Sequence, residues 1–291
     1  MNGIFRHEKV SIGGHVIDFE IGGNGRPLLL LHGFPETKLA WHKVISKLLP
    51  DHTIILPDIP GYGNSDGPRP SGDYSNYSKR SVGHVLSLLM KELEFDSYSV
   101  AGHDRGARIA YRMALDSQKD IQKIALLNII PTIEVAERIN YEKAYNMENW
   151  FFLAQPAPFP ETLINANPEF YLNHILDSWS LHPEMIPRES RKEYLVHFSK
   201  PAVIEKICAE YRAFRFDIQY DREDRMNRKT IKCPTLVLWS ENDFPTKDAS
   251  PLKIWSSWVE NVMGKGLSCG HFLMEEKPEE VGDALSEFFK A

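Results

Sequence analysis

Short, continuous runs of apolar residues recur along the chain, and each run leads into a turn rich in glycine or polar residues. Five such runs occupy residues 27–35, 53–63, 98–106, 123–131 and 234–243. Apolar strands without polar alternation are typical of a sheet that is buried on both faces. Helical patterns separate these runs, for example at residues 75–94 and 106–118. This alternation of strand and helix predicts an α/β fold with a mostly parallel, doubly wound sheet.

Two segments depart from this rhythm. Residues 5–23 alternate polar and apolar positions around a Gly-Gly turn, which predicts an antiparallel hairpin at the edge of the sheet. From about residue 133 to 229 the pattern is helical, with proline breaks, clustered aromatic residues and no evident buried strand. We therefore expect a core domain made of residues 1–132 and 230–291, with residues 133–229 inserted as a helical cap domain.

The composition is that of a globular chain of 291 residues, with 42% apolar and 25% charged residues and a net charge of -6. No lysine- or arginine-rich block suggests a nucleic-acid partner. The first residues lack the apolar core of a signal peptide, and no apolar run approaches the ~20 residues of a membrane span. Cys208, Cys233 and Cys269 have neither zinc spacing nor a paired pattern, so we expect small buried side chains in a cytoplasmic protein.

The segment Gly-His-Asp-Arg-Gly at residues 102–106 follows an apolar run and precedes a helical pattern. Its spacing is that of a nucleophile elbow, G-x-S-x-G, with aspartate in place of serine, which excludes a serine-type esterase. On such a turn Asp104 would lie at the carboxyl edge of the sheet, where its carboxylate could attack a substrate and form a covalent ester. The structural alternative is an aspartate that only caps the following helix.

Further residues complete a catalytic arrangement around this turn. The backbone N–H groups of Phe34 and Arg105 could form an oxyanion hole. His271 follows a small turn and precedes a helix near the C-terminus, where a neutral imidazole could take a proton from water. Three more polar residues adjoin these motifs, and we interpret them as loop-shaping rather than catalytic: His32, His103 and Asp58.

The acid that would orient His271 has two candidate positions, each at the end of a predicted strand. Asp243 follows the apolar run that ends near residue 239, and residue 128 ends the preceding run. Residue 128 is asparagine, which cannot carry the negative charge, so the sequence favours Asp243. The order Asp104, Asp243, His271 then matches the nucleophile-acid-base order of the fold.

With these motifs, the chain resembles the α/β-hydrolases of the haloacid dehalogenase, haloalkane dehalogenase and epoxide hydrolase group, and within it the fluoroacetate dehalogenase family. The resemblance covers nearly the whole chain. The Asp-Arg-x-x-Arg elbow within "GHDRGARIAYRMALD" and the cap segment "WFFLAQP" are specific, whereas "HGFP" and "GYGNSD" are common to the superfamily. It implies a hydrolytic dehalogenase that binds a short halocarboxylate, needs no metal or organic cofactor, and by analogy could form a homodimer.

The resemblance assigns Arg105 and Arg108 to the carboxylate of the substrate, which arginine binds through two hydrogen bonds. The two residues share one face of the helix that begins at the elbow, where cations oppose the helix dipole. The alternative is that both pair with acidic residues elsewhere. We expect them near the surface, where ion pairs contribute little to stability.

The halide site is also implied by the resemblance, which places Trp150 and Tyr211 as donors to the leaving halide. Trp179 resembles a further pocket residue. The alternative for these aromatic residues is packing in the core of the cap. Two positions depart from the family. Asn149, a further candidate for the halide site, stands where the family has histidine, and Asn128, a further candidate pocket residue, stands where the family commonly has its acid. These departures weaken the expectation of C–F bond cleavage.

Two other functions stay open at this stage. An epoxide hydrolase would use the same nucleophile, acid and base, with two cap tyrosines as proton donors; Tyr211 could be one, but Trp150 occupies the place of the other. A ligand-binding protein without turnover would have the same fold. The presence of nucleophile, acid and base together argues against a pure binder.

Overall fold

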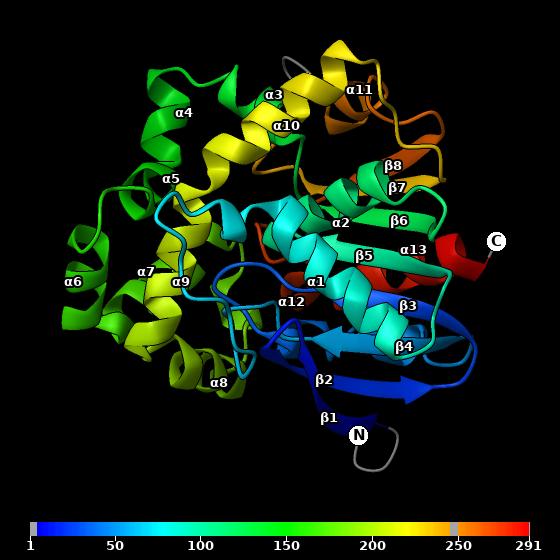
Figure 1. Ribbon diagram of the computed structural model, residues 1–291, viewed down its shortest axis with the longest axis horizontal. Helices are drawn as coiled ribbons and strands as arrows, with labels where there is room; N and C mark the ends of the chain where they lie inside the picture. Colours follow the sequence, from blue (N-terminus) through cyan, green and yellow to red (C-terminus); the bar gives the residue numbers. More distant parts are fainter. Residues whose placement is uncertain (1–4, 245–249, 291) are drawn as a thin grey trace.

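The computed structural model describes residues 5–244 and 250–290 (Figure 1). The centre is an eight-stranded sheet in the order β1-β2-β4-β3-β5-β6-β7-β8. The pairs β1/β2 and β2/β4 are antiparallel, and the remaining pairs are parallel. The strands are β1 Phe5–Ile12, β2 His15–Gly23, β3 Arg26–Leu31, β4 His52–Pro57, β5 Tyr98–His103, β6 Ile121–Leu127, β7 Thr235–Ser240 and β8 Val262–Leu267.

The five apolar runs correspond to β3, β4, β5, β6 and β7, and the predicted edge hairpin corresponds to β1 and β2. Successive side chains of β3 go to opposite faces of the sheet: Leu29 and Leu31 belong to one buried cluster, and Leu28 and Leu30 to the other. A strand with apolar neighbours on both faces must be apolar throughout, which explains the unbroken runs.

Helices cover both faces of the sheet. Helices α1 (Lys79–Glu92) and α2 (Arg105–Asp116) contribute to one buried cluster, and α13 (Pro278–Lys290) contributes to the other. The smaller elements of the core are η1 Lys38–Trp41, η2 Ile45–Lys47, η3 Ser75–Tyr77, α11 Pro251–Trp255 and α12 Leu273–Glu276. The predicted doubly wound α/β architecture is confirmed.

A helical cap is inserted between β6 and β7, and Figure 1 shows most of it on the left of the sheet, in green and yellow. Its helices are α3 Thr132–Ala136, α4 Tyr141–Asn146, α5 Glu148–Leu153, α6 Phe159–Ala166, α7 Pro168–Trp179, η4 Pro183–Met185, α8 Arg188–Phe198, α9 Pro201–Arg212 and α10 Phe214–Met226. Residues 133–229, all of them described, contain no strand.

The predicted domain limits, 1–132 with 230–291 and 133–229, stay a prediction, and residues 1–4, 245–249 and 291 of the core range lie outside the described residues. Among the helices that the structure describes, none has both the length and the apolar character needed to cross a membrane.

Candidate active site

Asp104 lies on a sharp turn between β5 and α2, with φ 44° and ψ -111°. Positive φ is uncommon for a residue with a side chain, and such strain is typical of functional turns. Asp104 occupies the N-cap position of α2, but its carboxylate makes no capping hydrogen bond to this helix, so capping does not account for the side chain. The glycine of the motif at position 106 is required by packing, because a Cβ atom there would lie 2.3 Å from the carbonyl oxygen of Leu31.

The loop after β3 passes directly against this carboxylate. The backbone N–H of Phe34 donates to Oδ2 of Asp104 at 3.1 Å. A Cβ atom on Gly33 would lie 2.8 Å from Cβ of Asp104, so only glycine permits this approach. The predicted proximity of Phe34 and Asp104 is present, and Arg105, the other predicted donor, is the first residue of α2.

His271 and Asp243 meet as the sequence predicted. Nδ1 of His271 lies 3.0 Å from Oδ2 of Asp243, and Nε2 of His271 is buried without a hydrogen-bond partner among the described residues. Ser240 connects the two loops: its hydroxyl donates to the carbonyl of Cys269 at 2.8 Å and accepts the N–H of Asp243 at 3.0 Å. A free Nε2 is the geometry that a general base requires.

Asn128 lies between the acid and the base. Its Oδ1 accepts the backbone N–H of Ser240 at 2.8 Å. Its Nδ2 lies 2.6 Å from Oδ2 of Asp243 and 2.9 Å from Nδ1 of His271. From the sequence, Asn128 was only a candidate pocket residue, at a position where the family commonly has its acid. The three contacts join residues that are far apart in the chain, so the sequence alone does not predict them.

The electrostatic environment keeps Asp104 ionised. Burial raises the pKa of this carboxyl, but electrostatic interactions with His271, Arg105, His103 and Arg108 together outweigh burial and lower the pKa to about 2. A nucleophilic carboxylate must be unprotonated to attack, so the surroundings favour this role.

Arg105 is fully buried, and none of its three guanidinium nitrogens has a hydrogen-bond partner among the described residues. Its guanidinium carbon lies 3.6 Å from the centre of the Tyr211 ring, a cation–π contact. Burial lowers the pKa of Arg105, but Tyr211 and Glu210 contribute to raising it above its usual value. The expectation of a near-surface ion pair was wrong, because the cap covers this part of α2.

Arg108 is also buried, but it is held differently. Its Nη1 donates to the carbonyl of Ile130 at 3.2 Å and to the hydroxyl of Thr132 at 3.1 Å, and its Nε has no partner among the described residues. The next arginine on this helix, Arg112, instead pairs with Asp221 and Asp224. The interpretation that Arg105 and Arg108 pair with acidic residues is therefore not supported, whereas it applies to Arg112.

Aromatic side chains of the cap cover the two arginines. The ring centre of Trp150 lies 4.8 Å from the guanidinium carbon of Arg108 and 4.3 Å from the ring centre of Phe214. The hydroxyl of Tyr211 is buried without a partner among the described residues. A cavity of about 260 Å³ borders Trp150, Tyr211 and Phe214. Trp150 and Tyr211 thus approach the site, and their donation to a halide stays a prediction.

The other two predicted pocket residues of the cap have different surroundings. Asn149 is buried, and its Oδ1 accepts the hydroxyl of Tyr171, a residue that the sequence did not single out. Trp179 contacts the base: its ring centre lies 4.9 Å from that of His271, and its carbonyl accepts the N–H of His271 at 2.7 Å. Trp179 therefore borders the site, whereas the amide oxygen of Asn149 is used within the cap.

His103, next to the nucleophile in the sequence, contacts the backbone of the base His271. Its Nδ1 lies 3.0 Å from a carboxylate oxygen of Glu36, and its Nε2 lies 2.8 Å from the carbonyl oxygen of His271. His32 and Asp58 likewise bind backbone: Nε2 of His32 accepts the N–H of Ile59 at 3.0 Å, and Asp58 accepts that of Lys38 at 3.0 Å. Their interpretation as loop-shaping residues fits these contacts.

The sequence did not predict a buried cluster of charged residues near Arg105. Glu210 of α9 accepts hydrogen bonds from Lys79 and from the hydroxyl of Tyr62. Burial raises the pKa of Glu210, but Lys79 and Arg105 lower it below its usual value. Because these residues are scattered along the chain, no sequence spacing indicated that they would meet.

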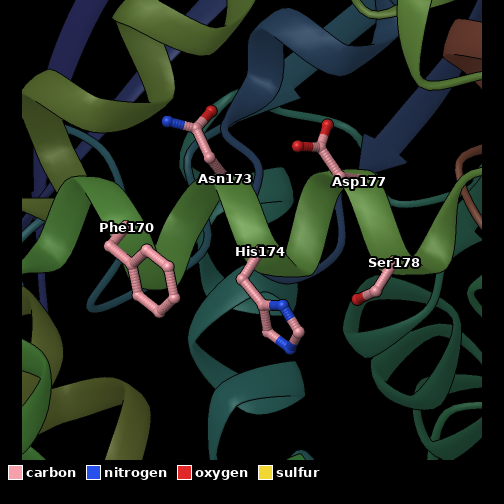
Figure 2. A pocket seen from close by; sticks show the side chains of 5 residues that line it. All are labelled: Phe170, Asn173, His174, Asp177 and Ser178. Atoms are coloured by element: carbon pink, nitrogen blue, oxygen red, sulfur yellow. The ribbon is translucent and has the colours of Figure 1, made fainter.

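A larger hollow, of about 540 Å³, lies along α7 and away from this chemistry. Figure 2 shows its lining: Phe170, Asn173, His174, Asp177 and Ser178. Asn173 and Asp177 already accept hydrogen bonds from Arg191. The unsatisfied buried donors around Asp104 make that site, rather than the larger hollow, the candidate active site.

Comparison with known proteins agrees with this geometry. The chain belongs to the α/β hydrolase fold family, which matches residues 26–278. The resemblance to the fluoroacetate dehalogenase family is also confirmed: the chain is 33% identical to the fluoroacetate dehalogenase of Burkholderia sp over 286 residues, 98% of this chain and 93% of that protein.

Two further relatives bear on function and fold. The chain is 28% identical to the soluble epoxide hydrolase of Corynebacterium sp. (strain C12), across 97% of this chain and 96% of that protein. A solved structure from Nostoc sp PCC 7120, assigned to the α/β hydrolases, has 40% identity and a TM-score of 0.95, with 98% of each chain covered. The chain is therefore a hydrolase by family, and its relatives include both dehalogenases and epoxide hydrolases.

Proposed function

We propose that this protein is a hydrolytic dehalogenase of short haloacids, which converts a haloacetate and water to glycolate and halide through an aspartyl ester. The observation that carries the proposal is the environment of Arg105. A fully buried guanidinium whose three nitrogens have no partner among the described residues is costly, unless an anion binds beside it. A substrate carboxylate supplies that anion and accepts two parallel hydrogen bonds from arginine.

The first step is a displacement at the α-carbon. Oδ2 of Asp104 accepts the N–H of Phe34, which leaves Oδ1 as the attacking oxygen. The Oδ1–carbon bond forms while the carbon–halogen bond breaks, and the bonding electrons leave with the halide. Arg105 and Arg108 neutralise the substrate carboxylate, so that two anions can approach each other. Trp150 and Tyr211 are the proposed donors to the departing halide.

The second step hydrolyses the ester. Nε2 of His271 takes a proton from water, and the resulting hydroxide attacks Cγ of Asp104. Negative charge develops on Oδ2, where the N–H of Phe34 already donates. Asp243 stabilises the imidazolium through Nδ1. Collapse of the intermediate breaks the bond between Cγ and the ester oxygen, and the departing glycolate oxygen takes the proton from Nε2 of His271. The new carboxyl group of Asp104 then releases its proton to water, which restores the carboxylate and the neutral base.

A second candidate function is epoxide hydrolysis. One observation favours it: the hydroxyl of Tyr211 is buried and unpartnered among the described residues, as the acid that protonates an epoxide oxygen would be. The paired arginines suit a charged substrate better than a neutral epoxide.

One experiment separates these functions. The enzyme is incubated in parallel with chloroacetate, bromoacetate, fluoroacetate and styrene oxide, and halide and diol are assayed. Our proposal predicts halide and glycolate from at least one haloacetate. Diol without halide would establish the epoxide hydrolase instead, and neither product would favour a ligand-binding protein.

A further inference from the structure

We propose that Asn128 is a positioning residue that controls which ring nitrogen of His271 carries the proton. Through this control it slows hydrolysis of the aspartyl ester relative to its formation. The kinetic part of this inference rests on the proposed function, whereas the protonation of His271 can be measured without any substrate.

The orientation of the Asn128 amide is fixed by the backbone. Oδ1 accepts the N–H of Ser240 at 2.8 Å. Rotating the amide would place its NH₂ group against that N–H, so a buried donor would lose its acceptor. The NH₂ group must therefore face the acid and the base, where Nδ2 lies 2.6 Å from Asp243 and 2.9 Å from His271.

A donor in this position distinguishes between the two neutral forms of His271. In the form that can act as a base, the proton is on Nδ1, and it points at Asp243, 3.0 Å away. Nδ2 of Asn128 and Nδ1 of His271 are then two donors in contact, and both compete for one carboxylate oxygen. In the other form Nδ1 is unprotonated and accepts a hydrogen bond from Asn128, while Nε2 carries the proton and cannot accept one from water.

Asn128 therefore stabilises the form of His271 that is inactive as a base. The neighbouring His103 does not bind Nδ1 of His271, because both of its ring nitrogens are engaged, one with Glu36 and one with the carbonyl oxygen of His271. His271 and Asp104 interact electrostatically, and this interaction contributes to lowering the pKa of Asp104. The balance at Nδ1 is thus set by Asp243 in one direction and by Asn128 in the other.

The direct test is ¹⁵N NMR of histidine-labelled protein, which reports whether Nδ1 or Nε2 of His271 carries the proton. Asn128→Gly removes the amide, and glycine tolerates the φ of 59° at this position. We expect a measurable Nε2–H population in the wild-type protein, and a shift to Nδ1–H in Asn128→Gly. The matched control is Asn242→Ala, which removes an exposed amide from the loop that carries Asp243 and should leave the spectrum unchanged.

The proposal is overturned if wild-type His271 is entirely in the Nδ1–H form, or if Asn128→Gly leaves the populations as they are. Should Asn128→Gly fail to fold, the double variant Asn128→Asp with Asp243→Asn provides the same test. It places an acceptor where Nδ2 now lies, so Nδ1–H should predominate.

Rapid-quench kinetics with chloroacetate give the second readout. Ester formation should be unchanged in Asn128→Gly, and ester hydrolysis should accelerate roughly threefold to tenfold, the effect of one unfavourable polar contact. Equal loss in both steps would indicate a purely structural role and refute the proposal. If no variant forms an ester, the proposed dehalogenase function fails, while the NMR result still decides the role of Asn128.

Discussion

Replacement of Arg105 by methionine should abolish most haloacetate turnover while leaving the fold intact. Methionine keeps an apolar chain of similar reach and removes both the charge and the donors. In the protein itself, the three guanidinium nitrogens make no hydrogen bond to any described residue, so the variant loses no internal hydrogen bond, only the cation–π contact with Tyr211. The loss should therefore fall on substrate binding and on the approach of Asp104 to the α-carbon.

The magnitude follows from the donors available. Two charge-assisted hydrogen bonds to a carboxylate are worth about 1.5–3 kcal/mol each. Because about 1.4 kcal/mol corresponds to a factor of ten, kcat/KM should fall roughly 10²- to 10⁴-fold. Arg108→Met should cost less, roughly 10- to 100-fold, because Nη1 of Arg108 already donates to Ile130 and Thr132.

The assay compares kcat/KM for chloroacetate and for neutral chloroacetamide, with thermal unfolding as the control for folding. The unfolding temperature of Arg105→Met should stay close to that of the wild-type protein. If activity on chloroacetamide falls as steeply as activity on chloroacetate, Arg105 does not bind the substrate carboxylate, and the reasoning is wrong.

Three further predictions follow from the same geometry. Asp243→Asn should slow ester hydrolysis more than ester formation in single-turnover kinetics, and adding Asn128→Asp should restore part of the rate; hydrolysis at the wild-type rate in the single variant would place the acid elsewhere. Because the pKa of Asp104 is lowered to about 2 in the folded protein, its ionised form stabilises the fold above pH ~4, and this contribution is lost as the pH falls through 2. Ester formation should therefore persist to about pH 3 in rapid-quench measurements, and its loss near pH 5 would contradict the lowered pKa. Gly106→Ala should lower the free energy of unfolding by roughly 1–3 kcal/mol in chemical denaturation, since the new Cβ would lie 2.3 Å from the carbonyl oxygen of Leu31. An unchanged free energy of unfolding would show that the backbone leaves room for a Cβ atom at this position.

The sequence predicted the central strands because burial on both faces demands unbroken apolar runs. It did not reveal β8, Val262–Leu267, where exposed and partly buried positions alternate and two glycines interrupt the pattern. An edge strand with one partner is only half covered, so it lacks the apolar signal of its neighbours.

Residues of the site that lie on a local motif were predictable, because the motif itself fixes their geometry. Asp104 lies on the elbow that its two flanking glycines allow, and His271 follows a turn. The surroundings of Arg105 were not predictable, since its burial depends on Tyr211, more than a hundred residues away. The same holds for Asn128, whose side chain meets two loops that only the folded sheet brings together.

The central claim is that Asp104 forms a covalent ester with the substrate. His271→Asn removes the general base and leaves the nucleophile in place, so the ester should accumulate after incubation with chloroacetate. Intact-mass spectrometry should show one added carboxymethyl group, and peptide mapping should locate it on Asp104. Release of halide with Asp104 unmodified would contradict the account, because displacement would then proceed without this nucleophile.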